Sequence, residues 1–122
     1  MKTTFATQRN TYSFNITKND VNENKKLTPS VLYTKMQAIA TNSLKELEAD
    51  KSIHQYLFKL NMLKNASLRD RLKITHTVQK YNDTEIVFSV RVSKENSKEN
   101  PLICDAIFGF KLLDKVALHS AS

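Results

Sequence analysis

The sequence is poor in the residues that many small metal-binding and nucleotide-binding domains require. Cys104 is the only cysteine in 122 residues, so neither an intrachain disulfide nor a cysteine-rich zinc site can form. Gly109 is the only glycine, which excludes the glycine-rich phosphate loops of P-loop and dinucleotide-binding proteins. The apolar runs are only a few residues long, which excludes a membrane-spanning helix. We therefore expect no metal ion, no cofactor and no membrane partner.

The charge of the chain is strongly basic. Lysine and arginine number 19 against 12 aspartate and glutamate residues, a net charge of +7. Either a simple basic surface or a polyanionic partner accounts for this balance, the partner being nucleic acid, a phosphate-bearing cofactor or an acidic carrier protein. The cations are scattered, with local clusters only at Lys25-Lys26 and 94–98, so nucleic acid is disfavoured. Residues 1–10 are polar and lack the apolar core of a signal peptide, which favours a cytoplasmic location.

The spacing of apolar residues changes twice along the chain, from a period of two to a helical period and back. Alternation predicts a strand at 12–16, followed by a polar loop at 17–26. Thr28 and Pro29 are typical of an N-cap and a first helical position, and an apolar stripe then continues to a predicted helix end near Asp50. Four further strands are predicted at 56–63, 72–79, 85–92 and 102–112, with Tyr56, Phe58, Leu60 and Met62 on one face of the first.

These elements predict an α+β fold in one domain, 1–122. One long apolar helix must be buried and one face of a five-stranded antiparallel sheet must be covered, so the sheet is expected to wrap around the helix. This order resembles the hot-dog fold over 11–113, and the tail at 114–122 would fray.

A polar segment before the helix strengthens the resemblance. Residues 20–24, with the sequence Asp-Val-Asn-Glu-Asn, look like the Asp-x-Asn-x-His segment of acyl-ACP thioesterases and the Asp-x-Asp segment of 4-hydroxybenzoyl-CoA thioesterases. The resemblance implies that Asp20 organises the site, that Asn22 occupies the next polar position, and that Asn24 stands where the acyl-ACP family has histidine. Either Gln37 or Met36 stands at the position of a glutamate that related thioesterases place about two turns into the helix. Catalysis would then rest on Asp20, with the three amides orienting a water or a carbonyl. As an alternative, the loop residues only form a turn.

The same resemblance implies substrate-binding groups. Oxyanion donors in this fold come from backbone N–H groups at the helix start, here Ser30, Val31 and Leu32, although these residues would also serve as an ordinary helix start. Tyr33 would line an acyl pocket or simply pack. His54 opens the strand that borders the active site in hot-dog dimers.

Three further residues are interpreted structurally. His76 alternates with core residues and is expected to be a core histidine with a hydrogen-bonded ring, the alternative being a catalytic base. Cys104 is expected to pack in the core. His119 lies in the tail and is expected to be exposed.

We therefore expect binding and hydrolysis of an acyl thioester of CoA or of an acyl carrier protein. A non-catalytic acyl-binding hot-dog protein and a dehydratase-like enzyme are alternatives, and a small helix-on-sheet interaction domain is a rival of another class. The resemblance also implies a homodimer through the strand at 56–63, or a dimer of dimers through the threonine-rich outer face of the sheet. The core is expected to be solid, with an acyl tunnel only at the dimer seam.

Overall fold

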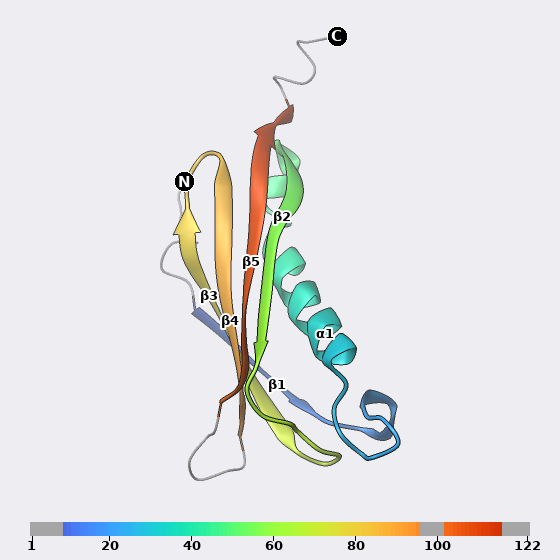
Figure 1. Ribbon diagram of the computed structural model, residues 1–122. Coiled ribbons are helices and arrows are strands. Elements are labelled where there is room, and N and C mark those ends of the chain that lie inside the picture. The colour runs from blue at the N-terminus through green and yellow to red at the C-terminus, as the bar shows by residue number, and fades with distance from the viewer. Residues whose placement is uncertain (1–8, 96–101, 116–122) are drawn as a thin grey trace.

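Five antiparallel strands and one α-helix form the part of the chain that the computed structural model describes, residues 9–95 and 102–115 (Figure 1). The strand order in the sheet is β1-β3-β4-β5-β2. The elements are β1 (Arg9–Asn15), the 3₁₀ turn η2 (Lys18–Asp20), α1 (Pro29–Asn42), the 3₁₀ turn η3 (Leu47–Ala49), β2 (Lys51–Met62), β3 (Arg71–Tyr81), β4 (Glu85–Lys94) and β5 (Leu102–Asp114). The expected β-α-β-β-β-β order and α+β class are confirmed.

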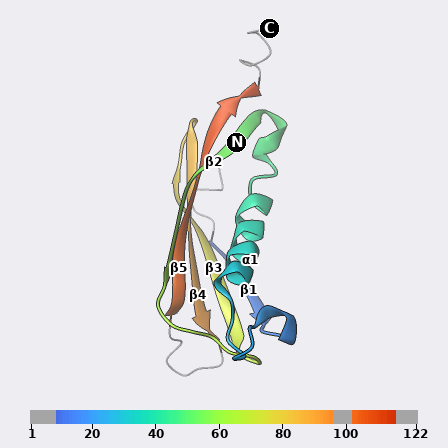
Figure 2. The same ribbon diagram turned by 45° about the vertical axis from the view of Figure 1, so that its right-hand side comes forward.

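Helix α1 runs along one face of the sheet (Figure 2). Its buried residues are Leu32, Met36 and Ala40, which recur every four positions and so share one side of the helix. They pack with alternate residues of the strands, including Phe88 and Phe108, both 0% exposed. No helix of the described residues covers the opposite face of the sheet, as is usual for an antiparallel sheet covered on one side, although Val87 on that face is only 8% exposed.

The helix is shorter than the sequence predicts, because it ends at Asn42 rather than near Asp50. Two side chains bond back to the helix at this end: Thr41 Oγ1 donates to the carbonyl of Gln37 at 2.9 Å, and Ser43 Oγ donates to that of Ile39 at 3.0 Å. Such bonds compete with the helical pattern. The apolar stripe nevertheless continues through turns and η3, where Leu44 is 2% exposed.

Strand β2 contains a bulge that the alternation did not reveal. The register shifts between Gln55 and Leu57, so Tyr56 lies on the outer face instead of sharing the inner face with Phe58. The prediction for Tyr56 is therefore wrong. Gly109 of β5 makes room for this arrangement, because a Cβ atom there would lie 3.0 Å from both Leu57 Cβ and Tyr56 Cε1.

Some predictions concern residues outside the described ranges. These are residues 1–8 of the polar N-terminal segment, residues 96–98 of the basic cluster at 94–98, and the tail from residue 116 with His119. Within the described ranges, no helix is long and apolar enough to cross a membrane.

Candidate functional site

The polar loop between β1 and α1 folds back on the helix start. Asp20 ends the η2 turn, and its Oδ2 accepts bonds from the Thr17 N–H at 2.9 Å and the Thr17 hydroxyl at 3.1 Å. The Asp20 carbonyl accepts the N–H of Thr28, the helix N-cap, at 3.2 Å. No described residue bonds Oδ1 of Asp20, so one carboxylate oxygen of this half-buried side chain is available to a solute.

Asn22 holds a tight turn together. Its Oδ1 accepts the N–H groups of Asn24 at 2.9 Å and Lys26 at 3.1 Å, and its backbone N–H donates to the Lys26 carbonyl at 2.9 Å. This is the local hydrogen bonding that asparagine favours in turns. The Asn24 side chain is exposed at the tip of the turn.

The free donor at the helix start belongs to Ser30. The N–H groups of Val31 and Leu32 both donate to the Thr28 carbonyl, at 3.2 and 3.3 Å, and Pro29 has no N–H. Among the described hydrogen bonds, the Ser30 N–H has no acceptor. Of the three predicted oxyanion donors, Ser30 is therefore the one whose N–H is available.

Gln37 lies at the seam between α1 and β2. Its Nε2 donates to Oε1 of Gln55 at 3.3 Å, and no hydrogen bond among the described residues joins it to the loop at 20–24. About one helical turn nearer the start of α1, Tyr33 meets Phe58 edge-on with 4.7 Å between ring centroids. The ring centroids of Phe58 and Phe108 lie 5.0 Å apart. Phe58 is 37% exposed, so this aromatic group is open at the edge of the sheet.

His54 lies on the other side of the sheet. Its strand neighbours Ile53 and Gln55 pair with the buried residues Leu112 and Phe110, whereas His54 pairs with the exposed Lys111. Its Nε2 lies 3.0 Å from the Ser52 hydroxyl. The structure therefore separates His54 from Gln37 by the thickness of the sheet.

A buried histidine lies on the inner face of β3. His76 is 2% exposed and its ring centroid lies 4.4 Å from that of Phe88, which confirms its predicted place in the core. Its Nε2 has no hydrogen-bond partner among the described residues, so the prediction of a hydrogen-bonded ring is wrong at this atom. Burial lowers the pKa of His76 to about 4, because the apolar surroundings disfavour the charged ring. Cys104 is also buried, as predicted, and burial, with a smaller effect of Asp105, raises its pKa to about 12.

Sequence reasoning missed a polar cluster around one carboxylate on the outer face of the sheet. Glu85 of β4 accepts the Tyr56 hydroxyl at 2.5 Å and lies 2.8 Å from Lys80 Nζ and 3.8 Å from Lys111 Nζ. The bonds from Lys80 and then Tyr56 lower the pKa of Glu85 to about 2. The cluster joins four strands and depends on the bulge that turns Tyr56 outward, so no local signal predicted it.

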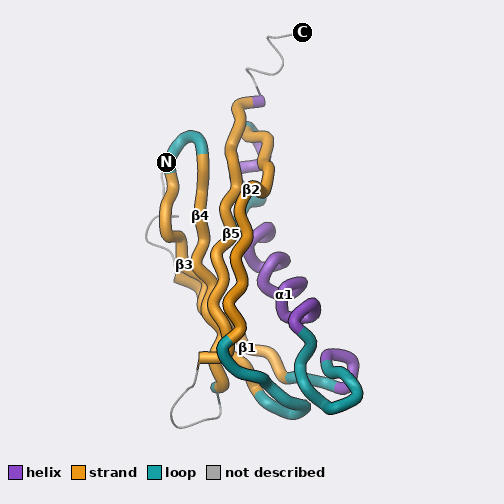
Figure 3. Tube along the Cα trace, viewed as in Figure 1, coloured by secondary structure: helices purple, strands orange, loops and turns teal. Residues whose placement is uncertain are grey.

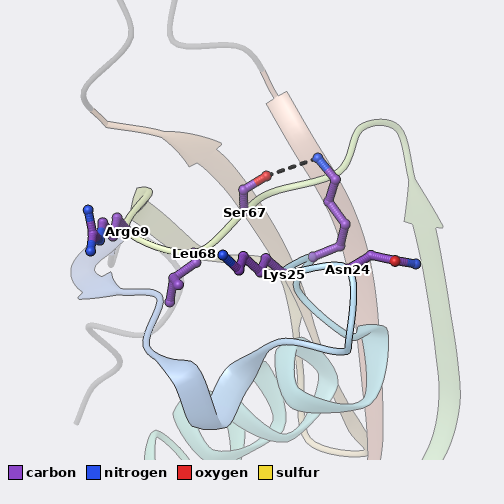
Figure 4. A pocket seen from close by; sticks show the side chains of 6 residues that line it. Asn24, Lys25, Ser67, Leu68 and Arg69 are labelled. Atoms are coloured by element: carbon purple, nitrogen blue, oxygen red, sulfur yellow. Dashed lines mark hydrogen bonds between the residues drawn. The ribbon is translucent and has the colours of Figure 1, made fainter.

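Sequence reasoning also missed a basic pocket where the β1–α1 loop meets the β2–β3 loop, two segments that lie side by side at one end of the molecule (Figure 3). The pocket has a volume of about 400 Å³. Its lining residues are Asn24, Lys25, Lys26, Ser67, Leu68 and Arg69 (Figure 4). The Lys25-Lys26 pair was visible in the sequence, but nothing local linked it to Arg69.

Comparison with known proteins identifies the architecture. A hypothetical thioesterase from Streptococcus pneumoniae TIGR4, crystallised with coenzyme A, superposes with a TM-score of 0.74 at 18% identity over 87% of this chain and 79% of that one. The 1,4-dihydroxy-2-naphthoyl-CoA thioesterase Slr0204 from Synechocystis gives 0.72 at 14% identity, over 88% and 84%. The Staphylococcus aureus protein SAV2348 in complex with CoA gives 0.76 at 15% identity, over 90% and 73%.

The chain therefore has the hot-dog fold, as the order of its elements predicted. No family model matches the sequence, and no curated protein matches it.

Proposed function

We propose that this protein binds an acyl thioester of CoA or of an acyl carrier protein and hydrolyses it. The observation that carries the proposal is the shared fold: the solved structures similar to this chain include named thioesterases and CoA complexes. The polar loop and the free Ser30 N–H add a carboxylate and a donor at the same end of the helix.

Thioester hydrolysis needs a base for water and a donor for the developing oxyanion. In the proposed mechanism, Oδ1 of Asp20 takes a proton as water attacks the carbonyl carbon, while Oδ2 remains bonded to Thr17. The Ser30 N–H stabilises the oxyanion. The carbon–sulfur bond then breaks, and the leaving thiolate takes the proton held by Oδ1 of Asp20, which returns the carboxylate to its starting state. Asn22, Asn24 and Gln37 would orient water or the substrate.

The proposed site includes a second copy of the chain. Strand β2 is at the end of the strand order, so its outer edge has no partner strand among the described residues. It is 12 residues long and contains no proline, which leaves its edge able to pair. A homodimer through β2 would cover Phe58 and close the seam beside Gln37. A dimer of dimers would use the outer face around Thr75 and Thr77.

The amides at the proposed site also favour a second function, acyl binding without turnover. Asn24 and Gln37 cannot exchange a proton near neutral pH, and the Asn22 carbonyl oxygen already accepts two backbone bonds. Such a protein would bind acyl-CoA and release little thiol.

A panel of acyl-CoA, acyl carrier protein and acyl-N-acetylcysteamine thioesters, read with a thiol reagent, tests the proposal. The buried Cys104 of the protein should contribute little background. We expect release above the uncatalysed rate from medium or long acyl chains. Release only from acetyl or other very short groups would contradict the acyl tunnel at the seam, and no release from any substrate would contradict hydrolysis.

A further inference from the structure

The basic pocket is built from two loops that are far apart in the sequence. The Leu27 N–H donates to the Ala66 carbonyl at 2.8 Å, and the Leu68 N–H donates to that of Lys25 at 3.0 Å. Between these backbone bonds, Lys26 Nζ donates to the Ser67 hydroxyl at 3.1 Å (Figure 4). The pocket walls are therefore fixed by main-chain pairing rather than by loose side chains.

The cations that line the pocket are not neutralised. Within the described residues, none of Lys25, Lys26 and Arg69 forms an ion pair. The nearby carboxylate of Asp70 accepts the Ser67 N–H at 2.8 Å and lies 3.5 Å from Lys94 Nζ. The pocket thus gathers positive charge and hydroxyl and amide donors in a concave surface, which suits an anion with several oxygens.

Two of these cations hold unusual backbone conformations. Lys25 has φ 63° and Arg69 has φ 77°, and they are the non-glycine residues with positive φ in the described chain. The left-handed region is unfavourable for residues with a Cβ atom and favours glycine or asparagine. Strained positions of this kind gather at functional sites, so long cationic side chains at both positions point to a ligand.

We infer that this pocket binds the phosphate groups at the nucleotide end of CoA. The inference rests on the proposed function and specifies CoA as the carrier of the acyl group. The charged ends of Lys25 and Arg69 lie apart rather than meeting at one point (Figure 4), and Lys26 Nζ is directed to the Ser67 hydroxyl. Such spacing fits a ligand with phosphates at separate positions, and CoA carries a diphosphate and a 3′-phosphate. The pocket and the Ser30 N–H belong to the same loop and helix start, since Lys26 is three residues before Pro29. The pantetheine arm would span the distance between them.

The test measures CoA binding to the full chain by calorimetry. The variant Lys25→Asn with Arg69→Asn removes two charges and places asparagine, which tolerates positive φ, at both strained positions. Lys45→Asn is the control, because Lys45 is exposed beyond the far end of α1. We expect the double variant to weaken CoA binding at least about tenfold, the effect of losing one or more charge-assisted bonds, and the control to bind as the wild type does.

Two smaller probes identify the phosphate. Pantetheine, which lacks the nucleotide, should bind the wild type and the double variant equally. If dephospho-CoA is as insensitive to the double variant as pantetheine is, the pocket holds the 3′-phosphate. If it loses affinity as CoA does, the pocket holds the diphosphate. Both results support the inference.

The inference is overturned if wild type does not bind CoA, if the double variant binds CoA as tightly as the control, or if pantetheine loses affinity equally. The inference is also overturned if the double variant turns over acyl thioesters of acyl carrier protein more slowly but binds CoA as tightly as the wild type. The pocket would then be a docking surface for the carrier protein. Hydrolysis of the phosphate-free acyl-N-acetylcysteamine thioesters is measured separately. If the double variant binds CoA tenfold more weakly and the wild type hydrolyses no thioester, the phosphate-binding pocket is supported and the proposed hydrolysis is refuted.

Discussion

The buried, unpartnered ring of His76 should make the protein lose stability in mild acid. Its pKa is about 4 in the folded chain, against 6.5 for an exposed histidine. The unfolded chain therefore binds more protons between these values, and the free energy of unfolding rises with pH across that window. The contribution is fully present above about pH 6.5 and falls as the pH drops toward 4. At about 1.4 kcal/mol per pKa unit, the loss should reach about 2 kcal/mol between pH 7 and pH 5 and about 3 kcal/mol by pH 4.

Urea unfolding followed by circular dichroism, at one protein concentration and at several pH values, measures this loss. The variant His76→Leu removes the titrating group and the buried Nε2 atom, so it should flatten the dependence between pH 7 and pH 5. Glu85 acts in a separate window, because its lowered pKa of about 2 removes stability only as the pH falls below its ordinary value of 4.5. His54→Gln is the control, since its ring is exposed. An equal slope in wild type and His76→Leu, or an NMR titration of the His76 ring near 6.5, would refute the reasoning.

Three other predictions concern the site, the sheet and the assembly. Asp20→Asn keeps an oxygen for Thr17 but removes the base, so thiol release should fall at least about a hundredfold, and Asn24→His should raise it. An unchanged rate in Asp20→Asn would make the loop an ordinary turn and refute Asp20 as the base. Gly109→Ala should cost about 1–3 kcal/mol in urea unfolding, because the new Cβ atom would crowd its neighbours on β2. If this variant has the same free energy of unfolding as the wild type, β2 shifts at no cost to make room for the new atom, and the expected crowding is contradicted. Light scattering at micromolar concentration should give twice the chain mass of 14.0 kDa, and a monomer would contradict the shared seam.

Much of the fold could be predicted because local patterns dictate it. Strict alternation marks strands, and Thr28 followed by Pro29 marks a helix start. The helix end was wrong because the stripe of apolar residues continues through turns that the period alone does not distinguish from a helix. The bulge at Tyr56 was missed because it depends on the pairing of β2 with β5, which alternation within one strand does not contain.

The candidate site likewise has a local part that could be predicted from the sequence and a part formed by tertiary contacts that could not. Asp20 and Asn22 lie in a short loop, so their turn chemistry could be foreseen from residue type. The pairing of Gln37 with Gln55 joins a helix to a strand edge, and the approach of Lys25 to Arg69 joins two distant loops. Contacts of this kind are set by tertiary packing and leave no mark in the spacing of residues.

The tight turns in the described part of the chain contain no glycine, since Gly109 lies in β5, and this limits how these turns can rearrange. Asn22 and Asn82 close their turns with side-chain oxygens that each accept two backbone N–H bonds. A glycine turn would sample many backbone states, whereas a turn held by its own side chain has few alternatives. A ligand that meets the loop at Lys25 therefore encounters a surface already ordered by folding. Binding there should proceed with little loss of loop entropy, as is typical of preorganised sites.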